Sequence, residues 1–436
     1  MAVNRQICRL SKIIAEREGI TFVEAEARLM ALTLDVFVGP NATTAAAHTA
    51  VLTTVNIASR SFLGGVSVSG NIEQPHRTAL PVAAGTLSSA AAACGATAAV
   101  PTPRFQIVIG DVGGAATQIP IWWDGWQAGA GRPIADAAAD NPLSAIAAAA
   151  LGVGMAFAAA AGVPYADELT VSLWPATPAP AFAEVFLPGA AWLVGMGNLG
   201  QAYLWALTAL PYTDPAGVEL LLQDADRITE ENWGTSVLVS EDDYGILKTA
   251  VAERWALAKG FRARRIDRFL RPSDRVGGDD PRVALSGLDR IEPRHVLGEV
   301  GFEAIVDAGL GRSAGDFDRY RVSVFDHTAP IQEFFAAQQD ALPNDALHEQ
   351  AAYRDLEQRI GRCGMAEIAG GAAAVPFVSA LAAALAVARL IALASGQPIP
   401  TNATGSALGQ KAARASPCRP VLGRSISRAG RPGAVP

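Results

Sequence analysis

The stretch AWLVGMGNLGQAYLWALTAL, residues 191–210, decides the fold of this chain. Four apolar or small residues run into a glycine-rich turn, and a helical pattern follows directly. A strand, a glycine turn and a helix in this order are typical of a nucleotide-binding loop. Glycines let backbone N–H groups approach a phosphate, and the helix N-terminus favours negative charge. The predicted nucleotide contacts in this turn are Gly195, Gly197, Asn198 and Gly200.

Strands and helices alternate after this turn. VELLLQDAD (218–226) is predicted to be a strand, residues 243–261 a helix, and PRVALSGLD (281–289) another strand. Two more strands, a polar helical insert at about 331–362 and a long apolar helix at 374–396 complete the pattern. Such alternation predicts an α/β fold, Rossmann-like, with a mostly parallel sheet.

The front of the chain repeats this pattern in a degenerate form. VFVGPNATT (36–44) resembles WLVGMGNLG (192–200), and the apolar stretch from Pro142 resembles the one from Pro376. Pro40 has no N–H to offer a phosphate, and alanine at position 42 blocks close approach. We therefore predict a front half that keeps the fold without the nucleotide site. Chance similarity between alanine-rich helices is the alternative.

These patterns predict three regions: an inactive half at 1–180, an active half at 185–400 and a tail at 401–436. The tail carries six basic residues and no acid, so we expect it to be disordered; nucleic-acid binding is an alternative role for it. The net charge of −7 argues against nucleic acid as the main partner. Two long apolar stretches are interpreted as buried helices and not as membrane spans.

The four cysteines lie far apart in the sequence and include no CxxC pair. This spacing fits neither a disulfide framework nor a zinc site, so no zinc is expected. A reducing compartment is then the expected location, and we predict a cytoplasmic protein.

A set of polar residues favours ATP over NAD as the ligand of this turn. Asp224 and Asp226 end one predicted strand, Asn232 and Lys248 follow, and Asp289 ends a later strand. Asp224 alone would suit the ribose of either nucleotide. An adenylating site needs an acid for Mg²⁺ (Asp289), a cation for the triphosphate (Lys248) and polar groups that hold ribose and phosphates. An NAD dehydrogenase has no need of this set.

Over residues 188–397 the sequence resembles the ThiF/MoeB and ubiquitin-activating enzyme family. That family combines a GxGxxG loop, a DxD pair, an asparagine, a lysine and an aspartate, and all of these have counterparts here. The resemblance implies an adenylating fold that uses ATP and Mg²⁺ to activate the C-terminus of a ubiquitin-like protein. An inactive half fused to an active half further resembles the activating enzymes of bacterial Bil antiphage operons. Those operons supply a ubiquitin-like protein and a conjugating enzyme as partners.

Two further residues enter through this resemblance. Cys363 stands where related enzymes carry the cysteine that forms a thioester, and a buried structural thiol is the alternative. Arg5 lies in VNRQI, which is similar to a family motif whose arginine reaches the partner subunit's ATP; a merely solvated arginine is the alternative. One family position departs from the pattern, because Thr235 replaces an arginine that contacts phosphate.

The resemblance leaves several questions open. An NAD-dependent oxidoreductase and a non-catalytic nucleotide-binding scaffold remain alternative functions. Sulfur transfer could replace conjugation to protein. The chain could act as a monomer that contains both halves, or as a homodimer.

Overall fold

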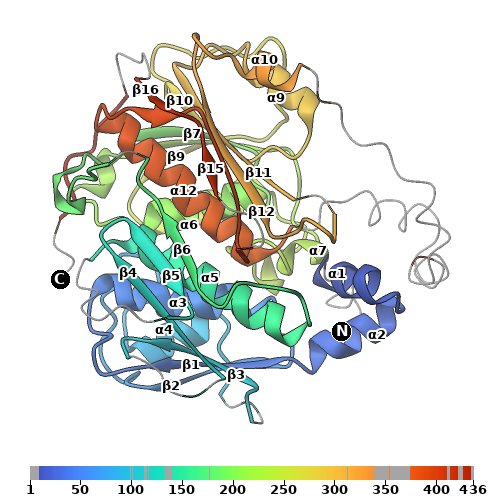
Figure 1. Cartoon of the computed structure of the whole chain (residues 1–436). Coiled ribbons are helices and arrows are strands. Elements are labelled where there is room, and N and C mark those ends of the chain that lie inside the picture. Colours follow the sequence, from blue (N-terminus) through green and yellow to red (C-terminus); the bar gives the residue numbers. More distant parts are fainter. Residues whose placement is uncertain are drawn as a thin grey trace.

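Two β-sheets enclose a central layer of helices in the computed structural model of the chain (Figure 1). The structure describes residues 9–98, 100, 102–111, 115, 117–132, 140–175, 177–311, 313–336, 338, 353, 374–409, 413–420 and 426–433. One sheet belongs to the front half and the other to the back half. A single apolar cluster of buried residues runs through both halves.

The front sheet has six strands in the order β2-β1-β3-β4-β5-β6. The first four are mutually parallel, and β5 and β6 pair antiparallel. Their bounds are β1 (Thr33–Val38), β2 (Gly65–Gly70), β3 (Phe105–Ile109), β4 (Gln118–Asp124), β5 (Gln127–Ala130) and β6 (Leu169–Ser172).

The back sheet has eight strands in the order β15-β14-β12-β11-β10-β7-β8-β9. Five neighbouring strands are mutually parallel: β11, β10, β7, β8 and β9. Beyond β11, the strands β12, β14 and β15 each pair antiparallel with their neighbour. Their bounds are β7 (Ala190–Val194), β8 (Glu219–Gln223), β9 (Arg262–Ile266), β10 (Val283–Ser286), β11 (Ala304–Leu310), β12 (Arg319–Phe325), β14 (Asn402–Ser406) and β15 (Arg414–Ala415).

The two sheets share one topology. The front order β2-β1-β3-β4-β5-β6 corresponds strand by strand, and direction by direction, to β8-β7-β10-β11-β12-β14 in the back sheet. In each half the first strand leads into a helix, which is α3 (Ala45–Ser59) or α6 (Asn198–Thr208). The predicted internal repeat is therefore confirmed, as is an α/β fold with mostly parallel sheets.

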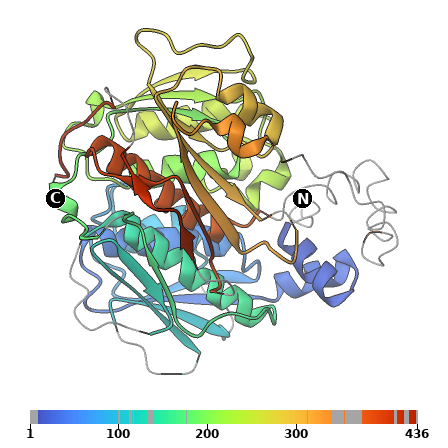
Figure 2. The same cartoon turned by 45° about the horizontal axis from the view of Figure 1, so that its top comes forward.

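Four helices form the layer between the sheets: α3, α5 (Pro142–Ala160), α6 and α12 (Pro376–Ala394). Figure 2 shows α12, in red, between the two sheets. Both α5 and α12 are long and apolar enough to cross a membrane, but 89% and 100% of their most apolar windows are buried inside the protein. They are alanine-rich because close packing of four helices leaves little room for larger side chains.

The remaining helices are short. The α1–α2 hairpin precedes β1, and Thr21 caps α2 through reciprocal hydrogen bonds with Glu24. The bounds are α1 (Arg9–Glu18), α2 (Phe22–Met30), α4 (Leu87–Ala93), α7 (Glu230–Trp233), α8 (Lys248–Ala258), α9 (Ile291–Leu297) and α10 (Ile331–Phe335). Of the predicted polar insert at 331–362, only residues 331–336, 338 and 353 are among those described.

The tail differs from its prediction. Its described residues are ordered: β14 and β15 extend the back sheet, and β16 (Cys418–Arg419) pairs with β13 (Ile399–Pro400). Further on, Arg428 and Pro432 form bridges to Pro188 and Tyr212. Disorder was the wrong expectation because composition does not report strand pairing or ion pairs. The two guanidinium nitrogens of Arg419 bind the two carboxylate oxygens of Asp326 at 2.8 and 3.0 Å.

This ion pair predicts a pH-dependent stability. Burial opposes ionisation of Asp326, yet its hydrogen bonds with Arg419 and Thr328 outweigh burial and lower the pKa to about 2. A depressed carboxyl pKa stabilises the fold above the unfolded pKa of about 4, and this stability is lost as the pH falls towards about 2. Asp326→Asn should therefore lower the thermal midpoint at pH 7 by about 2–4 °C, and the deficit should shrink between pH 4 and pH 2.

Scanning fluorimetry of the wild type and Asp326→Asn across this pH range measures the deficit. The exposed Asp279 supplies a control variant, Asp279→Asn, for which we expect no deficit. A deficit for Asp326→Asn that is equal at pH 7 and pH 2.5 would contradict the assignment.

Candidate nucleotide site

The glycine turn after β7 is built from backbone contacts that leave no room for side chains on one side. Gly195 has φ +86°, which favours glycine. A Cβ at Gly200 would lie 2.0 Å from the carbonyl oxygen of Gly195, and one at Gly287 would lie 2.8 Å from the same oxygen. The turns after β7 and β10 are thus packed directly against each other through glycines.

The other side of the turn is open. Among the residues that the structure describes, a Cβ at Gly197 would meet no atom within 4 Å. Gly197 is the N-cap of α6 and brings no side chain to the first N–H groups of that helix. The side-chain amide atoms Nδ2 and Oδ1 of Asn198 are buried without a hydrogen-bond partner among the described residues. Unpaired donors and acceptors of this kind need a ligand or water.

The corresponding turn of the front half is closed. Gly39 lies against Gly110, where a Cβ would be 2.5 Å from the carbonyl oxygen. At the start of α3 the Thr44 hydroxyl accepts from Ala47 N, and the Asp140 carboxylate accepts from Ala46 N at 2.7 Å. A carboxylate of the protein thus occupies helix-end donors that an anion would otherwise use.

Gly197 and Gly200 offer a direct test of the open side. Gly197→Ala adds a methyl group to open space in an allowed conformation, so the thermal midpoint should change by less than about 3 °C. If phosphate lies against this turn, the same methyl group should raise the Kd for ATP at least about tenfold, which equilibrium titration would measure. Gly200→Ala should in addition lower the thermal midpoint, since its Cβ collides with Gly195.

The control for this test is Gly278→Ala. Position 278 is also open, and no positive φ restricts it, but it lies outside the site. Equal ATP affinity in Gly197→Ala and Gly278→Ala would show that phosphate does not bind against this turn.

Asp224 follows β8 and holds the glycine turn. Its carboxylate accepts hydrogen bonds from Met196 N at 2.7 Å and from Asp226 N at 2.8 Å. Burial raises its pKa above the ordinary value, although the positive charge of Lys248 acts in the opposite direction. Each oxygen still has a free lone-pair direction, because a carboxylate accepts up to about four hydrogen bonds. Asp224 therefore positions the turn and retains acceptor capacity for a ribose.

Lys248 and Asp226 form an ion pair beside the turn. The Lys248 Nζ atom lies 2.8 Å from Asp226 Oδ2, and the lysine side chain is only 12% exposed while the aspartate is 50% exposed. Lys248 is the first residue of α8, and its N–H donates to the Asp226 carbonyl oxygen. Two contacts thus fix the lysine, and a triphosphate would have to share or replace Asp226 as its partner.

Asn232 lies in the short helix α7. Its side-chain oxygen accepts from Thr229 N at 2.8 Å and from the Thr229 hydroxyl at 3.2 Å, which caps the helix. Thr235 stands where the family pattern has an arginine. It is buried and donates its hydroxyl hydrogen to the Asn232 carbonyl oxygen. Thr235 therefore stabilises the loop and offers no charge to a phosphate.

Asp289 is an exposed residue in the turn after β10. The strand ends align across the sheet, because Val194 pairs with Gln223 on one side and with Ser286 on the other. The glycine turn, Asp224 and the turn that carries Asp289 therefore meet at one edge of the sheet. Their chemical roles remain predictions.

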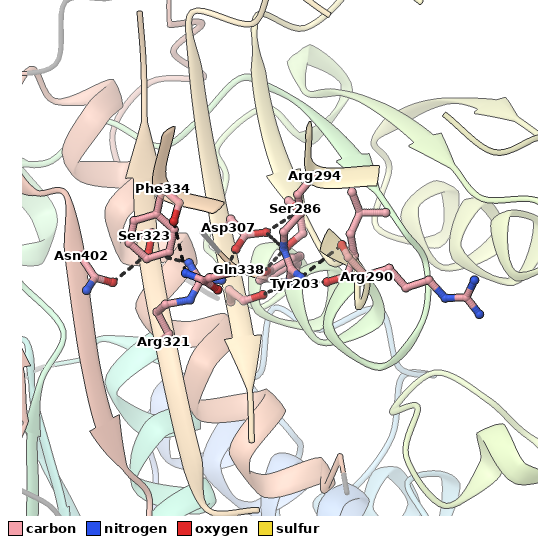
Figure 3. Close-up of polar contacts among 12 residues, drawn as sticks. Tyr203, Ser286, Arg290, Arg294, Asp307, Arg321, Ser323, Phe334, Gln338 and Asn402 are labelled. Atoms are coloured by element: carbon pink, nitrogen blue, oxygen red, sulfur yellow. Dashed lines mark hydrogen bonds and ion pairs between the residues drawn. The ribbon is translucent and has the colours of Figure 1, made fainter. Parts of the chain in front are cut away.

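A buried ionic cluster holds the Asp289 turn (Figure 3). The Arg294 guanidinium donates to the carbonyl oxygens of Leu288 and Arg290, on either side of Asp289, and to Asp307 at 2.9 Å. Asp307 also accepts from Ser286 at 2.7 Å and from Arg321 at 2.6 Å. Burial opposes ionisation of Asp307, but the two arginines outweigh it and lower the pKa. The cluster therefore keeps a charged, fully buried carboxylate and orients the turn through Arg294.

Sequence reasoning missed the members of this cluster. Asp307 could have been noticed, because a carboxylate inside the apolar strand AIVDAGL needs buried partners. Nothing in the sequence indicates that Arg294 and Arg321 are those partners. Sequence reasoning also missed Gly287, whose signal is the glycine in SGLD directly after a buried strand.

Arg5 and Cys363 lie outside the described residues. Among the residues that the structure describes, no group of three or more His, Cys, Asp or Glu side chains could hold a metal ion. Mg²⁺ commonly uses one or two carboxylates together with substrate phosphates and water, so Asp289 fits such a shared site.

Comparisons with known proteins match most of the chain. A family model described as the BilD C-terminal domain matches residues 187–397, and one described as the BilD N-terminal domain matches residues 33–173. The curated "Bacterial E1-like protein BilD" of Collimonas sp. (strain OK412) is 35% identical over 379 residues. That alignment covers 82% of this chain and 82% of the relative.

Solved structures give only distant likenesses. Escherichia coli MccB with ATP is 15% identical with a TM-score of 0.33, over 56% of this chain and 67% of that chain. PaaA is 14% identical with a TM-score of 0.34, over 53% of this chain and 64% of that chain. TM-scores this low support no further statement about this chain.

Proposed function

The chain belongs to the BilD family of bacterial E1-like proteins, and from this premise we propose that it uses ATP to adenylate the C-terminus of a ubiquitin-like protein. The observation that carries the proposal is the open side of the glycine turn. There, among the described residues, the buried amide of Asn198 has no hydrogen-bond partner and no side chain caps the N-terminus of α6, beside Asp224, Lys248 and Asp289.

In the proposed reaction, a carboxylate oxygen of the ubiquitin-like C-terminus attacks the α-phosphorus of ATP. The bond to the pyrophosphate oxygen breaks, and an acyl adenylate and pyrophosphate form. The attacking carboxylate is already ionised at neutral pH, so the site needs no general base. Its main task is to reduce repulsion between two negative groups and to hold them in line.

The residues of the chain have distinct parts in this task. The α6 N-terminus and Gly197 accommodate the phosphates, while Asp224 keeps the turn in shape and faces the ribose. Lys248 supplies a positive charge to the triphosphate. Asp289 would hold Mg²⁺, which neutralises phosphate charge when bound. Arg294 keeps the Asp289 turn in place. Arg5 would add a second cation from the front half.

A thioester would follow the adenylate. The Cys363 thiol loses its proton to solvent, the resulting thiolate attacks the acyl carbon, and AMP leaves. A conjugating-enzyme-like protein would then receive the acyl group by thiol exchange. We place this activity in bacterial antiphage defence. Because each chain contains both folds, one chain or a homodimer of such chains could carry the activity.

ATP–pyrophosphate exchange tests the function. Labelled pyrophosphate should enter ATP when the chain is mixed with a candidate ubiquitin-like protein encoded beside it, and no label should enter without that protein. Tight NAD binding without exchange would instead favour an oxidoreductase. ATP binding without exchange, across all candidate partners, would favour a non-catalytic scaffold.

A further inference from the structure

A loop of the back half, residues 233–239, lies against the glycine turn. Its Leu238 N–H donates to the side-chain oxygen of Gln201 at 3.1 Å. The side-chain nitrogen of Gln201 in turn donates to the carbonyl oxygen of Met196 at 3.2 Å. Gln201 is fully buried, so this link is shielded from water. A movement of the loop would therefore be transmitted to the glycine turn.

The same loop also fixes Asn232. The carbonyl oxygen of Asn232 accepts hydrogen bonds from Ser236 N at 2.8 Å and from Thr235 N at 3.2 Å. The predicted nucleotide contact of α7 thus depends on the course of the loop that follows it.

An arginine of the front half forms hydrogen bonds with this loop. Arg60 stands at the end of α3, and its guanidinium donates to three loop carbonyls: Trp233, Val237 at 3.3 Å and Val239 at 3.2 Å. It also lies 5.5 Å from the centre of the Trp233 ring. The neighbouring Asn56 orients Arg60 at 3.1 Å and donates to the Val237 carbonyl oxygen at 2.9 Å.

These contacts are buried and specific. Arg60 is 6% exposed and Asn56 5% exposed. Loop carbonyls lack the ladder partners of a sheet, so each buried one needs a donor. A guanidinium supplies several N–H groups in a fixed plane, whereas the ammonium group of lysine cannot span three acceptors. The loop therefore takes its shape from a residue of the other half.

We infer that Arg60 is a positioning residue for the nucleotide site, so that the inactive half is needed to hold loop 233–239 for ATP binding. The inference rests on the proposed function. The coupling runs from Arg60 through the loop to Asn232 on one side, and through Gln201 to the glycine turn on the other. Arg60 touches no reacting group and acts only through the loop.

The test compares Arg60→Lys and Arg60→Ala in the full chain. Each lost buried hydrogen bond should weaken the nucleotide-ready loop, so the Kd and KM for ATP should rise about tenfold in Arg60→Lys and about 30-fold or more in Arg60→Ala. The kcat for exchange should change less than about threefold, since the loop supports binding of the ground state. Backbone amides of 233–239 should exchange hydrogen faster while amides of β7 and β8 keep their protection.

Lys259→Met provides the matched control. Lys259 also joins the halves, through a hydrogen bond of 2.5 Å from its Nζ atom to the Ala79 carbonyl oxygen, which lies outside the loop. We expect wild-type Kd and loop protection in this variant. An equal rise in Kd in Lys259→Met would show general loosening between the halves and would overturn the inference.

The outcomes separate the inference from the proposed function. If the wild type binds ATP and Arg60→Lys binds it equally well, the inference is overturned alone. Unchanged hydrogen exchange in the loop of Arg60→Lys also overturns it alone. If the wild-type chain binds no ATP by direct titration, the proposed function and the inference fall together.

Discussion

Asp289→Ala should lower ATP–pyrophosphate exchange by about two to three orders of magnitude. The reason is electrostatic: the attacking carboxylate and the triphosphate repel each other, and Asp289 is the residue proposed to hold the cation that reduces this repulsion. Its side chain is exposed, and the turn that carries it is held by Arg294 and Asp307. The thermal midpoint should therefore change little, which separates loss of chemistry from loss of fold.

Glu292→Ala is the matched control for this prediction. Glu292 is an exposed carboxylate three residues further along, in α9, and should be dispensable. Exchange should be measured for both variants at saturating Mg²⁺, with ATP affinity measured separately. Exchange in Asp289→Ala within about threefold of the wild type would remove Asp289 from the site, because such a change is worth less than about 1 kcal/mol.

Cys363→Ala should abolish the adduct with the ubiquitin-like protein that is sensitive to dithiothreitol, and should leave exchange within about twofold of the wild type. Adenylation precedes thiol attack, so it does not need the cysteine. In this variant the adduct should therefore be lost while ATP–pyrophosphate exchange is retained. Gel electrophoresis without reductant detects the adduct, and a reducing lane confirms that it is a thioester.

Two other cysteines serve as controls. Burial raises the pKa of Cys94 to about 12, so this thiol is not an available nucleophile at neutral pH. Cys418 is exposed but lies in β16 and donates to the Pro175 carbonyl oxygen. Cys94→Ala and Cys418→Ala should form the adduct normally. An adduct that persists in Cys363→Ala would place the thioester on another residue.

The strongly patterned elements could be predicted from sequence, and the weakly patterned ones could not. The glycine turn and the alanine-rich helices have local signals. Strand β9, with the sequence RARRI, has none, because an edge strand takes its partners from the tertiary fold. Strand β2, with GVSVSG, has only a short alternation of valine and serine between two glycines. The two-residue loop between β4 and β5 is Gly125-Trp126, and its hairpin signal is the glycine at the first position, which has φ +53°.

The residues of the site also fall into those that the sequence predicts and those that it does not. The glycines and the acids at strand ends could be found because parallel strands bring their carboxyl ends to one edge. The supports of the site could not be found. Asp307 binds Arg294 and Arg321 from different elements, and Arg60 reaches a loop 173 residues away in the chain. Such partnerships are settled by packing, which leaves no periodic trace in the sequence.

The layer formed by α5 and α12 has a consequence for synthesis of the protein on the ribosome. Helix α5 ends at residue 160, and α12, which covers it, ends at residue 394. At about 5–20 residues per second, roughly 10 to 50 s separate the emergence of the two helices. During that interval the apolar, alanine-rich helix α5 lacks its packing partner α12. By length and composition α5 resembles a membrane segment. We therefore expect one apolar face of the nascent front half to stay exposed until the back half has been translated.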